Sequence, residues 1–145
     1  VLLYDEVTGA VGAVHAGWKG TAQDITGKAV EAMISTYGSD PRHIRAAIGP
    51  NIGQCCFETD EDVPNALLET YGDAISPYIS KRGNKFYVNL KAVNAYALTR
   101  RGVESIDIST DCTLCQTDRF WSARKHRDER GSQGAIIVCK GGIGK

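Results

Sequence analysis

Apolar residues recur along this chain in short runs, and most runs end at a glycine or at polar residues. Residues 1–4 and 10–15 are apolar runs joined through Gly9, a pattern typical of a β-hairpin. Single short runs elsewhere have the length of buried strands and are bounded by turn residues. These further predicted strands cover residues 44–48, 86–88, 103–108 and 135–139.

A helical period begins at Ile25, because Ala29, Met33 and Ile34 fall on one face of a helix and Gly38 is a natural C-terminal stop. The preceding Thr-Ala-Gln-Asp segment, residues 21–24, resembles a capping box and predicts the start of this helix. Two further helices are predicted over residues 63–71 and after Asn89, with an irregular stretch at 73–83. Strands and helices mix without a regular β-α-β order, so the predicted fold class is α+β, with mixed β-sheets flanked by helices.

The length of 145 residues suits one domain with its own core. We expect that single domain to span residues 1–139 and residues 140–145 to form a flexible tail. The chain begins directly on an apolar strand at Val1, and we therefore expect it to be a piece of a longer protein.

Composition narrows the function classes. Apolar residues make up 42% and charged residues 23%, and the formal net charge is zero. Nucleic-acid binding needs a surplus of Lys and Arg, so we expect no nucleic-acid partner. No apolar run approaches the roughly 20 residues of a membrane helix, so we expect no membrane association. Five cysteines cannot pair fully within one chain, which favours free thiols and a cytoplasmic location.

The segment His15-Ala-Gly-Trp-Lys-Gly20 is the most informative motif. It places a histidine at the end of a predicted strand, on a turn where Gly17 and Gly20 allow close backbone approach. An imidazole in that position can bind a metal or move a proton. The alternative is a tight strand-to-helix turn with a half-buried histidine and a packed tryptophan.

Cysteines supply two further candidates. Cys112-Thr-Leu-Cys115 has the spacing of a redox pair or of half a zinc site. The adjacent Cys55 and Cys56 have the wrong spacing to complete such a zinc site, so buried or loop thiols are the prediction for both pairs. A Gly/Pro-rich loop precedes Cys55, and it could position either neighbouring thiol as a nucleophile with His15 as base.

The segment Arg119-Phe-Trp-Ser-Ala-Arg-Lys125 places two aromatic residues before a basic pair. It could stack on a base and neutralise a phosphate. Equally, Phe120 and Trp121 could anchor the segment to the core, followed by a solvated charged loop.

Three motifs in this order resemble the laccase-domain family, also called multicopper polyphenol oxidase or YfiH-like proteins. They are His15-Ala-Gly-Trp-Lys-Gly20, the segment 48–58 with Cys55-Cys56, and Cys112-Thr followed by 120–125. The resemblance implies a YfiH-like mixed fold of the kind shared with a toxin-type cysteine hydrolase. It implies a purine nucleoside phosphorylase, which cleaves adenosine, inosine and methylthioadenosine with phosphate and can deaminate adenosine. Older descriptions of the family name a copper-dependent polyphenol oxidase.

The resemblance also implies a mononuclear zinc site. His15 matches one of three metal ligands, and the other two, a cysteine and a histidine, would lie upstream of Val1. The chain is therefore similar to the C-terminal portion of a family member. Zinc is the expected cofactor; copper is reported for the family, but three histidines are too few for multicopper centres.

For the intact parent, the resemblance implies a transferase with purine nucleoside and phosphate as partners. His15 would be the catalytic metal ligand, and Trp18, Lys19 and Arg124 would bind substrate. Two competing classes remain open: a thiol hydrolase, and a non-catalytic fragment. The oligomeric state stays open.

Overall fold

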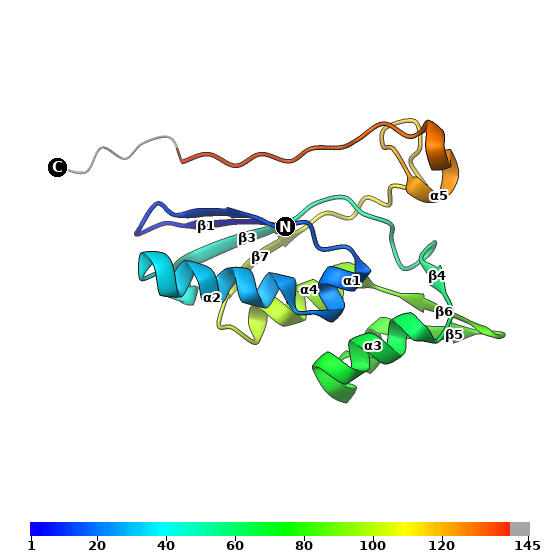
Figure 1. The fold of residues 1–145 in the computed structure, drawn as a ribbon, viewed down its shortest axis with the longest axis horizontal. Coiled ribbons are helices and arrows are strands. Elements are labelled where there is room, and N and C mark those ends of the chain that lie inside the picture. Colours follow the sequence, from blue (N-terminus) through cyan, green and yellow to red (C-terminus); the bar gives the residue numbers. More distant parts are fainter. Residues whose placement is uncertain (140–145) are drawn as a thin grey trace.

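The computed structural model describes residues 1–139, which form two β-sheets with helices packed against them (Figure 1). The larger sheet has the strand order β2-β1-β3-β7, with α2 and α4 lying together along one side of it. The smaller sheet has the order β4-β6-β5 and lies beside α3. The strands are β1 (Leu2–Asp5), β2 (Val11–Ala13), β3 (Ile44–Ile48), β4 (Glu58–Thr59), β5 (Ile79–Arg82), β6 (Lys85–Val88) and β7 (Ser105–Ile108). The α-helices are α1 (Trp18–Ala22), α2 (Ile25–Tyr37), α3 (Asp62–Tyr71), α4 (Leu90–Thr99) and α5 (Ala123–His126).

The larger sheet is mixed. Strand β1 pairs antiparallel with both β2 and β3, whereas β3 pairs parallel with β7, with Ile48 opposite Ile108. The predicted hairpin of β1 and β2 is confirmed, and Gly9 takes a φ of +72° at its turn. Strand β2 ends at Ala13, so His15 lies in the loop that leads to α1 rather than in the strand. These sheets and helices confirm the predicted α+β class.

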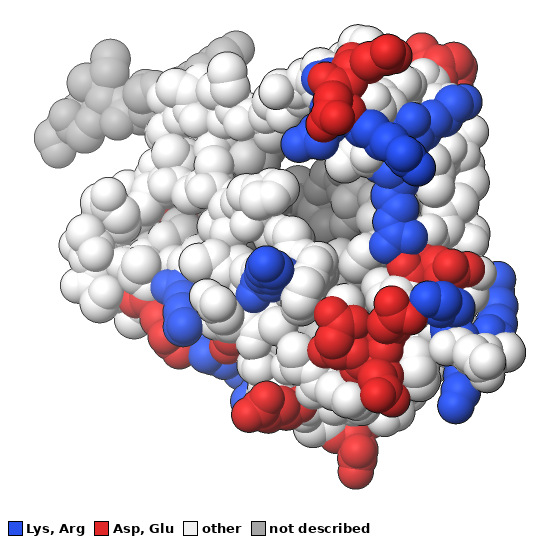
Figure 2. Space-filling model, turned by 45° about the vertical axis from the view of Figure 1, so that its right-hand side comes forward, with Lys and Arg blue, Asp and Glu red and all other residues white. Residues whose placement is uncertain are grey.

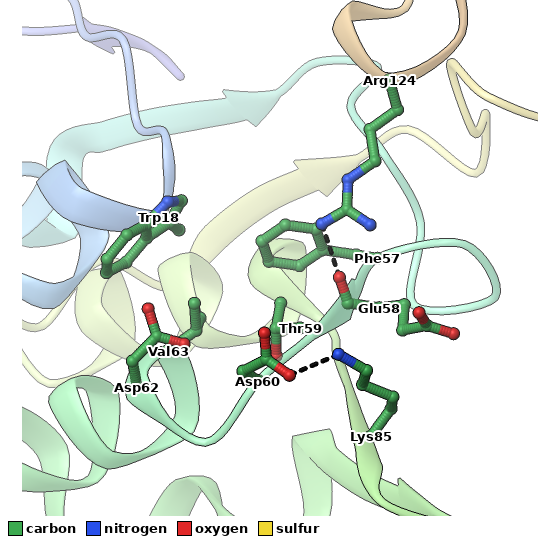
Figure 3. Close-up of a pocket in the computed structure, with 9 residues that line it drawn as sticks. All are labelled: Trp18, Phe57, Glu58, Thr59, Asp60, Asp62, Val63, Lys85 and Arg124. Atoms are coloured by element: carbon green, nitrogen blue, oxygen red, sulfur yellow. Dashed lines mark hydrogen bonds and ion pairs between the residues drawn. The ribbon is translucent and has the colours of Figure 1, made fainter.

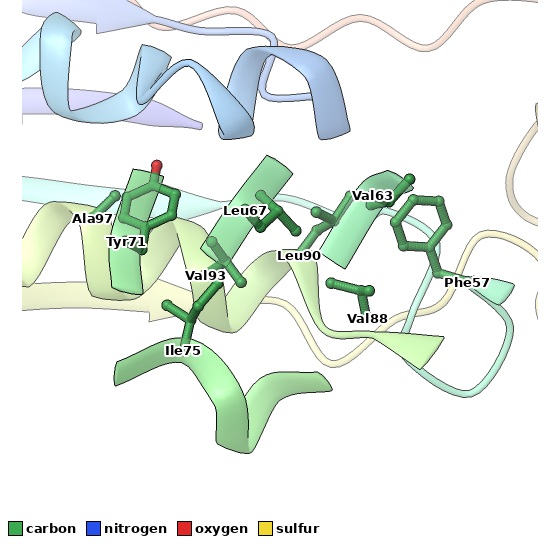
Figure 4. Packing of buried hydrophobic residues seen from close by; sticks show 9 residues of the cluster. All are labelled: Phe57, Val63, Leu67, Tyr71, Ile75, Val88, Leu90, Val93 and Ala97. Atoms are coloured by element: carbon green, nitrogen blue, oxygen red, sulfur yellow. The ribbon is translucent and has the colours of Figure 1, made fainter. Parts of the chain in front are cut away.

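Two clusters of buried residues make up the core. One lies between α2, α4 and the larger sheet and includes Leu3, Val30, Ile44 and Leu98, all fully buried. The other joins α3 and α4 to the smaller sheet (Figure 4). Its buried members are Phe57, Val63, Leu67, Tyr71, Ile75, Val88, Leu90, Val93 and Ala97.

The predicted capping box at residues 21–24 is wrong. Thr21 is fully buried inside α1, and its hydroxyl donates to the carbonyl of Ala16 at 3.3 Å. Asp24 separates α1 from α2 with a left-handed φ of 54°, and its side chain makes no cap hydrogen bond. Its carboxylate instead accepts from Arg101 at 2.7 Å and from Tyr71 at 3.2 Å. The Asp24 carboxylate therefore binds a guanidinium and a phenol from distant parts of the chain instead of the backbone N–H groups at the start of a helix, as the capping box predicted.

The predicted buried face of α2 is also partly wrong. Ile34 is exposed, while Thr26 and Val30 are fully buried. The buried face tolerates the polar Thr26 because its hydroxyl donates to Asn94 of α4 at 2.6 Å.

Most other elements follow the predictions. Helix α3 carries Pro64 in its first turn, α4 is capped by the Asn89 side chain, and β3, β6 and β7 form where expected. The prediction of an irregular stretch at 73–83 is wrong for its second half, which forms β5 and pairs antiparallel with β6. Within residues 1–139, no helix has both the length and the apolar character needed to cross a bilayer.

The predicted buried strand at 135–139 is wrong. Ile136 exposes 90% of its surface and Val138 exposes 73%. The segment passes alongside the larger sheet toward the β1–β2 turn, where Cys139 Sγ lies 3.4 Å from the position that a Cβ atom would take at Gly9, but it makes no strand pairing to any residue in the described part of the chain (Figure 1). An apolar run forms a buried strand only when a neighbour takes its backbone hydrogen bonds and covers its side chains. The predicted tail at 140–145 lies outside the described residues.

Asp5, at the end of β1, makes the stability of this fold sensitive to acid. Burial alone would raise its pKa, but surrounding donors, including the Val7 N–H at 2.8 Å and the Thr8 hydroxyl at 2.7 Å, outweigh burial and lower the pKa to about 2. A lowered folded-state pKa stabilises the protein above the unfolded value and is lost as the pH falls. We expect up to about 2 kcal/mol of stability to disappear between about pH 4 and pH 2.

Urea unfolding midpoints measured across that pH range test this expectation. Asp5→Asn should flatten the acid limb, whereas Asp73→Asn, at an exposed carboxylate, should leave it unchanged. An equal acid limb in the parent and in Asp5→Asn would contradict the assignment.

Candidate functional site

Two adjoining cavities lie where α1, the β3–β4 loop and α5 meet. The first has a volume of about 330 Å³ and the second about 350 Å³. Trp18, Phe57 and Arg124 line both, so the cavities share a wall. The first is also lined by Glu58, Thr59, Asp60, Asp62, Val63 and Lys85, and the second by Ile52, Thr113, Ser122 and Ala123.

Trp18 is the first residue of α1, directly after the extended Gly17. The helix is held onto α3 by two side chains of the latter. The Thr70 hydroxyl donates to the Ala22 carbonyl at 2.5 Å, and the Tyr71 hydroxyl donates to the Thr21 carbonyl at 2.8 Å. These bonds fix the helix, and with it the indole that faces the cavities.

Arg124 approaches the same space from α5, far away in the sequence (Figure 3). Its guanidinium lies 5.5 Å from the centre of the Phe57 ring and donates to the Glu58 carbonyl oxygen. The side chain is exposed, so the guanidinium keeps free donors for a ligand. The site therefore combines an indole, a phenyl ring and a planar cation.

The rim of the first cavity carries both signs of charge. Figure 2 shows a hollow on this face, with basic and acidic side chains together above it and acidic side chains below it. Among the lining residues, Asp60 pairs with Lys85 of β6, and this contact raises the pKa of Lys85. The Glu58 carboxylate accepts from the Tyr87 hydroxyl at 2.5 Å, which raises the pKa of Tyr87. Of the two cations that line the first cavity, Arg124 is the one that forms no ion pair within residues 1–139, so an anionic ligand would be attracted most strongly on its side.

The structure brings two of the sequence-predicted substrate residues together, Trp18 and Arg124. Lys19 does not line either cavity; its ammonium lies 5.7 Å from the centre of the Trp18 ring. Phe57 belongs to the motif at 48–58, but no motif singled out Asp60 or Lys85, since these two residues approach each other only when β4 pairs with β6.

His15 is exposed and stands outside both cavity linings. Its Nε2 atom lies over Gly17, 3.2 Å from the position that a Cβ atom would take there. Within residues 1–139, no group of three or more potential metal ligands includes His15. The described residues therefore offer one donor at this point and do not fit a three-ligand zinc site by themselves.

A different set of side chains has the composition of a metal site. The Sγ atoms of Cys55, Cys56, Cys112 and Cys115 all lie within 4.8 Å of one another. The expectation that the two cysteine pairs could not complement each other is therefore wrong. The spacing of the cysteines along the sequence does not predict this cluster, because the fold brings the loop after β3 next to the loop after β7.

Comparison with known proteins decides the family. Residues 1–140 match the family described as multi-copper polyphenol oxidoreductase laccase. This chain belongs to that family. The structure is also similar to the crystal structure of YlmD from Geobacillus stearothermophilus, with a TM-score of 0.80 and 30% identity over 90% of this chain and 49% of that chain.

Relatives in this family carry enzymatic names. The chain is 35% identical to the purine nucleoside phosphorylase YlmD of Geobacillus stearothermophilus, covering 92% of this chain and 48% of that protein. It is 33% identical to the adenosine deaminase RL5 of an unknown prokaryotic organism, covering 86% of this chain and 48% of that protein. The chain thus spans about half the length of the curated relatives it matches.

Proposed function

We propose that the protein carrying these residues is a zinc-dependent purine nucleoside phosphorylase. Its substrates would be adenosine, inosine or methylthioadenosine together with phosphate, and adenosine deamination is a further activity of the same site. The names of the relatives support the reaction class. The observation that carries the proposal is the convergence of Trp18 and Arg124 on shared cavity space, because an aromatic face and a guanidinium suit a base and an oxyanion.

In this proposal the cavity residues bind and orient. The Trp18 indole stacks on the purine, and Phe57 keeps the Arg124 guanidinium in place through the contact described above. Arg124 neutralises phosphate or holds the ribose, and Lys19 supplies positive charge beside the indole. Stacking contacts between bases and aromatic rings contribute about 1–3 kcal/mol each.

Zinc would supply Lewis-acid chemistry at His15, with its remaining ligands contributed from outside this chain. His15 alone gives a weak and unselective site, since catalytic zinc usually has three protein ligands. We therefore assign no step to the metal within these residues.

The surroundings of Cys55 and Cys56 disfavour a thiol hydrolase. Burial raises the pKa values of Cys55 and Cys56, which disfavours the thiolate that a nucleophile needs. Both sulfurs lie close to that of Cys115, at 3.6 Å from Cys55 and 3.4 Å from Cys56. Polyphenol oxidation by a multicopper centre is not supported, because such a centre needs many histidine ligands and the chain has three histidines.

We further propose that residues 1–139 behave as one domain in a reducing, cytoplasmic setting. Free thiols in all five cysteines support that setting.

Arg124→Ala tests the function. A chimera in which these residues replace the matching half of Geobacillus YlmD should release purine base from inosine only when phosphate is present. Loss of a charge-assisted hydrogen bond should raise the KM for phosphate about 10- to 100-fold. Chromatographic quantification of hypoxanthine across a phosphate titration provides the measurement.

Lys125→Ala is the matched control, because it removes the neighbouring positive charge from a side chain that lines neither cavity. Its KM for phosphate should not change. Base release without phosphate would reject phosphorolysis, and equal kinetics for the two variants would reject the role of Arg124.

A further inference from the structure

Four cysteine thiols from two distant parts of the chain gather at one edge of the larger sheet. Cys55 and Cys56 lie in the turn after β3, and Cys112 and Cys115 lie in the turn after β7. Cys115 Sγ lies 3.6 Å from that of Cys55 and 3.4 Å from that of Cys56, and all four sulfurs fit within 4.8 Å. The proposed phosphorylase reaction does not use this group.

The fold explains why the loops meet. Strands β3 and β7 are parallel neighbours, so the loops that follow them leave the sheet at the same edge. A bridge between Asn51 and Cys112, with the Thr113 N–H donating to the Asn51 carbonyl at 3.0 Å, continues the pairing beyond the strands. The two cysteine pairs are therefore held together by backbone contacts.

The turn conformation explains how adjacent cysteines can act together. In a strand, Cys55 and Cys56 would point to opposite faces. Here the N–H groups of Cys56 and Phe57 both donate to the Gly53 carbonyl, at 3.0 and 2.9 Å, and close a tight turn. Both thiols consequently reach Cys115.

We propose that Cys55, Cys56, Cys112 and Cys115 bind one zinc ion in a closed tetrahedral site that fastens the β3–β4 loop to the loop after β7. With a Zn–S bond of about 2.3 Å, the sulfurs of a tetrahedral site lie about 3.8 Å apart. The distances of 3.4 and 3.6 Å and the outer limit of 4.8 Å bracket that value. No sulfur–sulfur distance has to change by more than about 1 Å to complete the site.

The surroundings suit a cluster of thiolates. The Gly53 N–H points at the sulfur of Cys112 from 3.2 Å, as a donor to a negatively charged sulfur should. A Cβ atom at Gly53 would lie only 3.2 Å from both the Cys112 Cβ and the Cys55 Sγ, so a glycine leaves the room that the loop needs.

A buried cation offsets part of the charge. Zinc with four thiolates carries a net charge of −2, and Lys91 of α4 is buried beneath the same loop. Its ammonium donates to the carbonyls of Ser109 and Asp111 at 2.7 and 2.5 Å. A buried ammonium needs nearby negative charge, and the thiolates would provide it.

The arrangement favours a single ion over the other uses of four thiols. An iron–sulfur cluster places inorganic sulfide between its ligands and needs cysteine sulfurs that are farther apart. Soft thiolates in a tetrahedral set select zinc over harder divalent cations. Four protein ligands leave no open position, so the ion would be structural. It would position Phe57 and Thr113, which follow the ligands directly in sequence and line the cavities.

Metal content and spectroscopy of the 145-residue chain test the proposal. The reduced chain should bind one equivalent of zinc by elemental analysis and release thiol protons on binding. X-ray absorption should show a shell of four sulfurs at about 2.3 Å. Cobalt(II) in place of zinc should show intense tetrahedral d–d bands with sulfur-to-cobalt charge transfer.

Variants assign the ligands. Cys112→Ser and Cys115→Ser should lower zinc affinity at least about 10-fold. Cys139→Ser removes a thiol outside the cluster and should retain one equivalent, as should His15→Ala. Should the ligand variants fail to fold, stepwise titration of the parent with a mercurial should release zinc as the cluster thiols react.

Three results would overturn the proposal: less than half an equivalent of zinc in the reduced parent chain, a nitrogen- or oxygen-rich shell, or loss of the metal in His15→Ala with retention in Cys112→Ser. None of these results depends on phosphorylase activity, so this proposal and the proposed function can fail separately.

Discussion

Replacing Leu67 with alanine should lower the free energy of unfolding by about 2–5 kcal/mol. Leu67 is fully buried in α3, where it faces Val93 and Leu90 of α4 (Figure 4). Removing its branched end loses transfer free energy and leaves a cavity that two packed helices cannot close. Urea unfolding, compared by midpoint at an unchanged m-value, measures the loss.

Leu67→Met is the matched control because it conserves volume and should cost less than about 1.5 kcal/mol. Leu67→Ala should also affect the candidate site, since Phe57 and Val63 belong both to this buried cluster and to the lining of the first cavity. Equal midpoints for the alanine and methionine variants would mean that the α3–α4 contact is not close-packed.

Elements with local signals could be predicted from the sequence. Helix α3 combines an apolar face with Pro64 at its start and Gly72 at its end, and Asn89 caps α4 by accepting from the Ala92 N–H at 3.1 Å. Each of these signals lies within one turn of the element it specifies. The predictions of α3 and α4 are confirmed because capping and backbone preferences depend on interactions between residues close together in the sequence.

Features set by distant partners could not be predicted. Asp24 binds Arg101 of a later segment instead of capping α2, and residues 135–139 have an apolar pattern without a neighbouring strand. Motif reasoning identified Trp18 and Arg124 singly, but their shared cavity depends on how α1 and α5 pack around Phe57.

The cysteines illustrate the same limit. Cys55-Cys56 and Cys112–Cys115 look incompatible along the sequence because metal-site rules of thumb count residues between ligands. Parallel pairing of β3 with β7 makes that count irrelevant. The turn after β3 then serves two purposes, since it carries two thiols and leads directly into Phe57 of the cavity.

Asn94→Ala should destabilise the protein by about 3 kcal/mol. Asn94 of α4 is 1% exposed and links three helices through its amide. It accepts from the Thr26 hydroxyl at 2.6 Å and donates to the Thr21 hydroxyl at 3.0 Å and to the Leu90 carbonyl at 2.8 Å. Truncation leaves buried polar groups unpaired, at about 1–3 kcal/mol for each group. Because Thr21 belongs to the helix that carries Trp18, the indole should also become more mobile.

Asn65→Ala, at an exposed position of α3, controls for helix propensity and should stay within about 0.5 kcal/mol of the parent. The double variant Thr26→Val with Asn94→Ala should lose less stability than the sum of the two single variants, because removing both partners leaves fewer groups unpaired. Additive losses of stability in this cycle would mean that the two side chains act independently. An unchanged tryptophan fluorescence anisotropy in Asn94→Ala would mean that the Asn94 hydrogen bonds do not position Trp18.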